Sequence, residues 1–301
     1  MAETITLEEV LEALAAAAHR SLLQREVDPA LRDQMMQELR RRAAEKPLAE
    51  VVADFVGAVG KSDEALALAV DARDVGVMLH SLIKPAVERR PVPLTCLSGG
   101  CMPTVAGMLR RSGLRRWAGP FDWMTIPPEA VRDSIADDFT LLMLPEEHEP
   151  IPASERPPGA AGHLCRHRRF TEMYGPTLFH VHDPKTPAGF AKLERSVLRM
   201  RDSLRALHGK MLLQVTEEDP ATPHLFLETA ELLERTSRGV ALVTIALVEG
   251  TPDGLFPEME PSLRQGKHQL LRCRPVSTPG GLAFGDPLDE VVLLRGAMAG
   301  V

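Results

Sequence analysis

The chain has 301 residues, with 35 basic and 42 acidic side chains, a net charge of −7, and 44% hydrophobic residues. This composition excludes disordered and collagen-like chains, and the acidic balance with only 9 Phe, 2 Trp and 1 Tyr disfavours nucleic-acid binding. No apolar run reaches the roughly 18 residues of a membrane span, and the N-terminus does not read as a secretory signal. With four scattered cysteines, we expect a cytoplasmic protein.

Residues 1–88 are expected to form a small all-helical domain. Thr6 and Glu9 fit a capping box ahead of a run with helical spacing. Further helices are predicted over residues 29–44, 48–59 and 62–83. Residues 24–30 and 52–55 loosely resemble a helical domain related to phycobilisome linkers. A protein partner for the N-terminal helices is also considered.

The Pro-rich segment 84–93 is predicted to be a linker, and residues 94–301 an α+β domain. Strands are expected over 94–97, 177–182, 210–216 and 239–248, and helices over 102–111, 187–207 and 222–235. The run from residue 240 to 248 is apolar almost throughout, as in a strand buried on both faces. Residues 145–163 are expected to be a Pro-rich surface loop able to fold over a cleft.

Cys101 is the candidate nucleophile. Gly99 and Gly100 allow a tight turn between a strand and a helix that begins at or just after the cysteine. The helix dipole at that position is expected to lower the pKa of the thiol, and the neighbouring amides could stabilise an oxyanion. The other three cysteines are expected to be buried and unreactive: Cys96, Cys165 and Cys273.

His180 and His182 are the candidate bases, because residues at i and i+2 share one face of a predicted strand. The same spacing also suits a zinc site, which is kept as an alternative although no third ligand is fixed by local spacing. Several carboxylates could orient the imidazole: Asp183, Asp122, Glu217 or Asp219.

Residues 94–295 resemble a bacterial family of papain-like cysteine peptidases, catalogued mainly as a domain of unknown function. Three motifs carry the resemblance: Leu97–Cys101, Pro120-Phe121-Asp122-Trp123, and His182-Asp183 ahead of an Arg-rich helix. The resemblance implies a papain-like fold over 94–301 and a site of Cys101, His182, Asp183 and Asp122. Gly99, Gly100, Trp123 and His180 would then contact the substrate or the oxyanion. Papain's oxyanion Gln, six residues before its Cys, is replaced by Thr95 here.

These observations predict an enzyme that forms an acyl-enzyme at Cys101 with a Cys-His dyad or triad. A peptidase, an amidase and an acyltransferase share this step, and the substrate would be a peptide or another acyl-bearing molecule. No cofactor or metal is expected. The alternatives are a non-catalytic binding protein on a papain-like fold, and a metal-dependent enzyme that uses the His180/His182 pair.

Overall fold

The computed structural model describes residues 29–60, 94–156, 164–250 and 256–299, together with residues 6, 9–16, 83 and 252. The first elements are α2 (Pro29–Ala43), α3 (Leu48–Gly60), β1 (Thr95–Ser98), α7 (Pro103–Arg111), β2 (Met124–Thr125), α8 (Pro128–Ala136), β3 (His148–Pro150), β4 (Cys165–His167), α9 (Arg168–Tyr174) and β5 (Leu178–Phe179). They are followed by α10 (Pro187–Arg205), β6 (Lys210–Glu217), α11 (Thr222–Thr236), β7 (Val240–Leu247), β8 (Glu258–Gln265), β9 (His268–Arg274), β10 (Pro279–Gly280), β11 (Ala283–Phe284) and α12 (Pro287–Ala299). The expected mixture of helices and strands is confirmed.

The described N-terminal residues are helical where the sequence predicts helices. Residues 9–16 form a helix whose capping box is present: Thr6 N donates to Glu9 Oε2 at 2.9 Å, and Glu9 N donates to Thr6 Oγ1 at 3.2 Å. α2 and α3 agree with the predicted bounds to within one residue. The fourth helix, apart from Ile83, and the linker over 84–93 fall outside the described residues.

The main sheet has five strands in the order β1-β6-β7-β9-β8. The first four are parallel, and β8 pairs antiparallel with β9 at one edge. β7 is buried along its whole length, as its apolar sequence predicts. Strands that are buried on both faces need helices on both sides, and the connections β1–α7, β6–α11 and α12 after β9 provide them.

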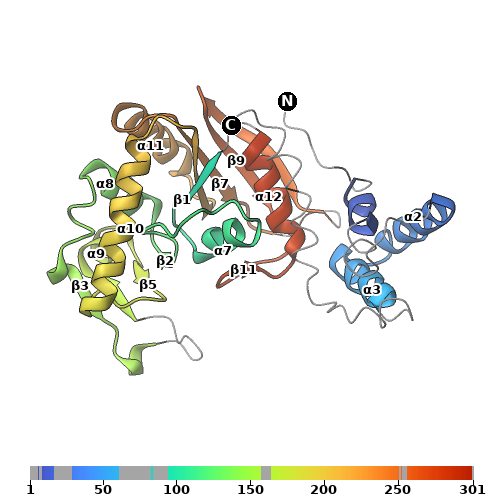
Figure 1. The fold of residues 1–301 in the computed structure, drawn as a ribbon, viewed down its shortest axis with the longest axis horizontal. Coiled ribbons are helices and arrows are strands. Elements are labelled where there is room, and N and C mark those ends of the chain that lie inside the picture. The colour runs from blue at the N-terminus through green and yellow to red at the C-terminus, as the bar shows by residue number, and fades with distance from the viewer. Residues whose placement is uncertain are drawn as a thin grey trace.

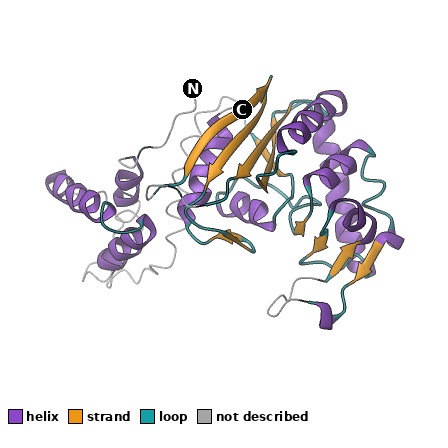
Figure 2. Ribbon diagram, turned by 180° about the vertical axis from the view of Figure 1, so that it is seen from behind, coloured by secondary structure: helices purple, strands orange, loops and turns teal. Residues whose placement is uncertain are grey.

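Two layers of helices enclose this sheet (Figures 1 and 2). Alternate residues of β6 separate the layers: Leu212 belongs to a core shared with α8, α10 and α11, whereas Met211 and Leu213 belong to a core shared with α7 and α12. α12 is also covered from outside, since Leu288 and Val291 join a third core with the N-terminal helices. The two parts of the chain therefore share a hydrophobic core at α12.

A second, four-stranded antiparallel sheet lies beside α9 and α10, in the order β2-β5-β4-β3. Its strands have only two or three residues, and two of the sequence predictions are wrong here. β3 lies inside the segment 145–163 that was expected to be a loop, of which residues 157–163 are outside the described range. β5 ends at Phe179 instead of continuing to His182, because Asp183 and Pro184 begin a turn that leads into α10.

Candidate functional site

The turn between β1 and α7 carries Cys101 at the carboxyl end of the parallel strand. Gly99 N still donates to Leu213 O of β6 at 2.7 Å, and the chain then reverses through Gly100, with φ 72°, and Cys101, with φ 69°. A Cβ atom on Gly99 would lie 2.5 Å from Gln214 Cγ. The two glycines are thus required by close packing and by the left-handed backbone. Cys101 adopts the same left-handed conformation with a side chain, which is strained.

The Cys101 thiol is buried, with 8% of the residue exposed. Its Sγ lies 4.0 Å from Gly99 O, and among the described residues its hydrogen bonds include no imidazole. Burial and the negative charge of Glu129 hold the pKa of Cys101 well above its usual range. The expected lowering of this pKa is therefore wrong: α7 begins two residues later at Pro103, and loss of solvation outweighs the helix dipole. The other three cysteines are buried and free, as predicted.

His180 is linked to the Cys101 turn indirectly, through the segment that contains β2. Its backbone N donates to Trp123 O at 2.9 Å, and a 2.8 Å hydrogen bond joins its Nε2 to Thr125 Oγ1. The residue after Thr125 is Ile126, which forms an isolated antiparallel bridge with Cys101. The ring of His180 and the thiol turn are therefore held by adjacent residues of one short segment.

His182 lies beyond the end of β5, so it does not share a strand face with His180 as the sequence suggested. Its imidazole lines a pocket together with Trp123, and its pKa is lowered because burial and the positive charge of Lys192 both disfavour the charged form. The neighbouring Asp183 shapes the loop: its Oδ1 accepts from Lys185 N at 2.9 Å. His182 thus lines the pocket, whereas Asp183 stabilises the backbone of the loop.

The close approach of this loop to α10 depends on Gly189 in the first turn of the helix. A Cβ atom there would lie 1.9 Å from Asp183 O. Thr186 caps the helix, with its Oγ1 accepting from Gly189 N at 3.1 Å and donating to Asp183 O at 2.7 Å. The loop that carries His182 is therefore fixed to the start of α10.

Asp122 is held by Arg115 through a buried ion pair of 2.6 Å, Nη1 to Oδ2. Burial raises the pKa of Asp122 to about 6, against the lowering effect of Arg115. The guanidinium of Arg115 also covers the Trp123 ring, with 5.0 Å between Cζ and the ring centroid. Asp122 therefore positions Trp123 through Arg115. Of the two remaining acidic candidates, Asp219 accepts from Ala221 N through its Oδ1 just before α11, and Glu217 is exposed at the end of β6.

Trp123 and His182 meet at a pocket of about 170 Å³ between the Ala118–Pro120 turn and one face of α10. The turn residues Gly99, Gly100 and Cys101 are not part of its lining. The structure thus brings Trp123 and His182 together at one pocket, and neither Cys101 nor His180 belongs to its lining. The Arg-rich helix was expected from the sequence, but its place as the basic side of this pocket, through Lys192, Arg195 and Arg199, was not.

Within the described ranges, no group of three His, Cys, Asp or Glu side chains is arranged to hold a metal ion. In the same part of the chain, no helix is both long and apolar enough to cross a bilayer. Comparisons with family models, curated proteins and solved structures find no match to this chain. Function must therefore be inferred from side-chain geometry.

Proposed function

We propose that the protein is an enzyme that transfers an acyl group through Cys101, either to water, as a peptidase or amidase, or to another acceptor. The observation that carries this proposal is the left-handed backbone of Cys101, φ 69°, at a strand-to-helix turn. Strain of this kind is costly and concentrates at functional positions. Nucleophiles of other hydrolases are presented on the same kind of sharp strand–turn–helix junction.

The raised pKa of Cys101 means that the resting thiol is protonated, so its proton must leave as the sulfur attacks. In the proposed step the S–H bond breaks, an S–C bond forms at the acyl carbon, and the bond to the leaving group breaks. An imidazole takes the thiol proton and returns it to the leaving group. His180 is the first candidate for this base, since its partner Thr125 precedes the residue that bridges to Cys101. His182, facing the pocket, is the second.

We further propose that the domain is papain-like and that its substrate is a peptide or another acyl-bearing molecule. We also propose that the N-terminal helices bind a protein partner. A cytoplasmic location is proposed on the four free cysteines. A non-catalytic binding protein is the second candidate, favoured by the burial of the Cys101 thiol and by its position outside the pocket lining.

Acetylation by p-nitrophenyl acetate tests the acyl-enzyme. The ester should place one acetyl group on Cys101, detected by mass spectrometry of the intact chain and of its peptides, with release of p-nitrophenol. Cys101→Ala should abolish this adduct, whereas the matched variants Cys165→Ala and Cys273→Ala should retain it. His180→Gln should slow acetylation by about 10²–10⁴ if that imidazole is the base, and His182→Gln should do so if the second candidate is correct. Slow and equal labelling of all four cysteines would favour the binding protein.

A further inference from the structure

The face of α10 that lines the pocket is strongly basic. Lys192, Arg195 and Arg199 follow one another at i, i+3 and i+7, so they lie along one side of the helix. The adjacent side is anchored in the core by Leu193 and Val197, which fixes the rotation of the helix about its axis. The packing of α10 therefore turns the face that carries the three exposed cations toward the pocket.

None of these three cations has an ion-pair partner among the residues that the structure describes, whereas other basic residues of the same helix do. Arg201 Nε lies 3.3 Å from Asp138 Oδ1, and Arg205 Nη2 lies 3.2 Å from Asp138 Oδ2. Three like charges beside a pocket with low-dielectric walls create a positive potential that attracts anions. The pocket side of α10 thus presents positive charge that is not balanced within the described chain.

Apart from the basic stripe, the pocket lining is largely apolar and includes Trp123, Pro120 and Pro184, together with His182. The guanidinium of Arg115 lies over the Trp123 ring and pairs with Asp122. A ring that is already held in place can stack on a planar ligand group at little conformational cost.

We propose that this pocket binds a small organic phosphate, with its phosphate on the basic stripe of α10 and its planar ring against Trp123. The rise of about 1.5 Å per residue separates Lys192 from Arg199 by roughly 10 Å along the helix axis. One phosphate can therefore contact two neighbouring cations, and a diphosphate can extend to the third. A bidentate guanidinium suits phosphate oxygens, and the stripe contains two arginines. This inference goes beyond the acyl-transfer proposal and does not depend on Cys101.

Titration with phenyl phosphate, inorganic phosphate and a nucleoside diphosphate tests the site. Binding is measured by calorimetry and by the fluorescence of the Trp117→Phe protein, in which Trp123 is the remaining tryptophan. We expect phenyl phosphate to bind more tightly than inorganic phosphate and the nucleoside diphosphate to bind most tightly, with affinities that fall as salt rises. Arg195→Gln and Arg199→Gln should each weaken binding about 10- to 100-fold. The matched control Arg205→Gln, on the same helix but outside the pocket, should not.

The Trp123→Leu protein separates the two halves of the site, because it should bind inorganic phosphate normally and lose the preference for phenyl phosphate. Circular dichroism and melting of each variant show whether it is folded. Absence of binding to folded wild-type protein at millimolar ligand, or equal binding by the Arg195 and Arg205 variants, would overturn the proposal. Repeating the titration on Cys101→Ala keeps the two proposals apart, since phosphate binding should survive there even though acetylation is lost.

Discussion

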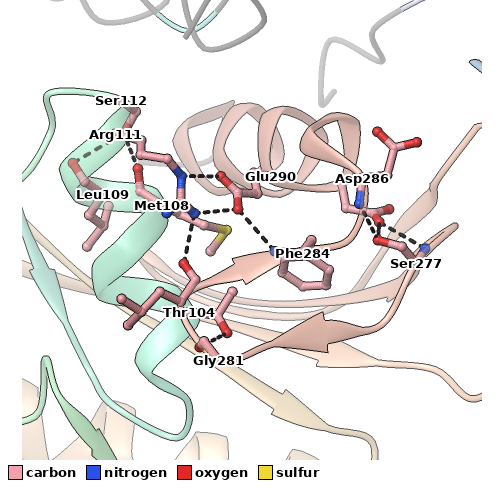
Figure 3. Close-up of polar contacts among 12 residues, drawn as sticks. Thr104, Met108, Leu109, Arg111, Ser112, Ser277, Gly281, Phe284, Asp286 and Glu290 are labelled. Carbon is pink, nitrogen blue, oxygen red and sulfur yellow. Dashed lines mark hydrogen bonds and ion pairs between the residues drawn. The ribbon is translucent and has the colours of Figure 1, made fainter. Parts of the chain in front are cut away.

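Arg111 of α7 and Glu290 of α12 form an ion pair where the β10–β11 hairpin passes between the two helices (Figure 3). Arg111 Nε donates to Glu290 Oε2 at 3.1 Å, and the glutamate is 1% exposed. The same two side chains bind the hairpin backbone: Arg111 Nη2 donates to Leu282 O at 2.9 Å, and Phe284 N donates to Glu290 Oε1 at 3.1 Å. The helix that follows the Cys101 turn is thereby tied to the C-terminal helix.

Arg111→Met should be destabilising, because it removes the guanidinium that pairs with the buried Glu290 carboxylate. Loss of one member of a fully buried pair costs about 3–5 kcal/mol, and we expect a smaller loss here because the Arg111 side chain is 31% exposed. Urea unfolding measures this, with Arg41→Met as control, since the contacts of Arg41 with Glu38 and Glu45 are exposed to solvent and contribute little to stability. The double variant Arg111→Met with Glu290→Met should recover much of the loss. Equal effects of the two single arginine variants would show that the buried pair contributes little.

Gly107→Ala in α7 should also be destabilising, although alanine has a higher helix propensity than glycine. A Cβ atom at Gly107 would lie 2.0 Å from Leu282 O of the hairpin, so the helix or the hairpin must move. Overpacking of this kind costs about 1–3 kcal/mol, more than the roughly 1 kcal/mol that alanine gains over glycine in a helix. Gly209→Ala is the control because its Cβ would meet open space. Urea midpoints compare the two, and a stabilised Gly107→Ala protein would contradict the close contact.

Substitutions of Cys101 can measure the backbone strain directly. Cys101→Gly should be more stable than Cys101→Ala by about 1–2 kcal/mol, because glycine adopts the left-handed φ of 69° without steric cost. The same pair of substitutions at Cys96, in the regular strand β1, should show the opposite order, since glycine weakens a strand. Chemical unfolding of the four proteins gives the comparison. If alanine is preferred at both positions, Cys101 is not strained.

His148 should make stability fall in mild acid. Burial lowers its pKa to about 4, and its Nε2 is bonded to Leu142 O at 3.0 Å. The folded-state pKa lies below the unfolded value of about 6.5, so the stability that His148 contributes is complete above pH 6.5 and is lost as the pH falls toward 4. Between about pH 7.5 and about pH 5 this amounts to about 2 kcal/mol.

His148→Gln should remove this part of the pH dependence, because the glutamine amide can still donate to Leu142 O but does not titrate. His224→Gln, at a side chain that is 78% exposed, should leave the dependence as in the wild type. Unfolding free energies at both pH values decide the matter. A His148→Gln protein with an unchanged slope would mean that other groups cause the acid sensitivity.

The sequence predicted β6 and β7 from their continuous apolar runs, and α10 and α11 from their helical apolar spacing. It did not predict the other two long strands of the main sheet, β8 and β9. α12 was not predicted, because it is buried against the sheet on one side and against the N-terminal helices on the other, and so lacks an amphipathic pattern. The strands of the small sheet have two or three residues, too few for any periodic pattern to appear.

The sequence indicated several residues of the candidate site, but it did not predict how they are arranged in space. The glycine turn before Cys101 and the capping of the helix after His182 follow from local sequence. The direction of the Cys101 pKa shift depends on burial among residues distant in sequence, which no local pattern reveals. Likewise, the pocket arises only because the Ala118–Pro120 turn meets α10 in space, about 70 residues later in the chain.

Parallel pairing of β1 with β6 has a consequence for the order of folding. Gly99 and its partner Gln214 are separated by 115 residues, so the contacts that shape the Cys101 turn close a long loop. Such contacts form late, after local helices and after the β6–α11–β7 unit, whose pairings lie closer in sequence. During synthesis β1 is therefore an apolar segment without its pairing strand until β6 has formed. In that interval it can aggregate with other chains. The turn that carries the proposed nucleophile is therefore completed only after β6 has formed.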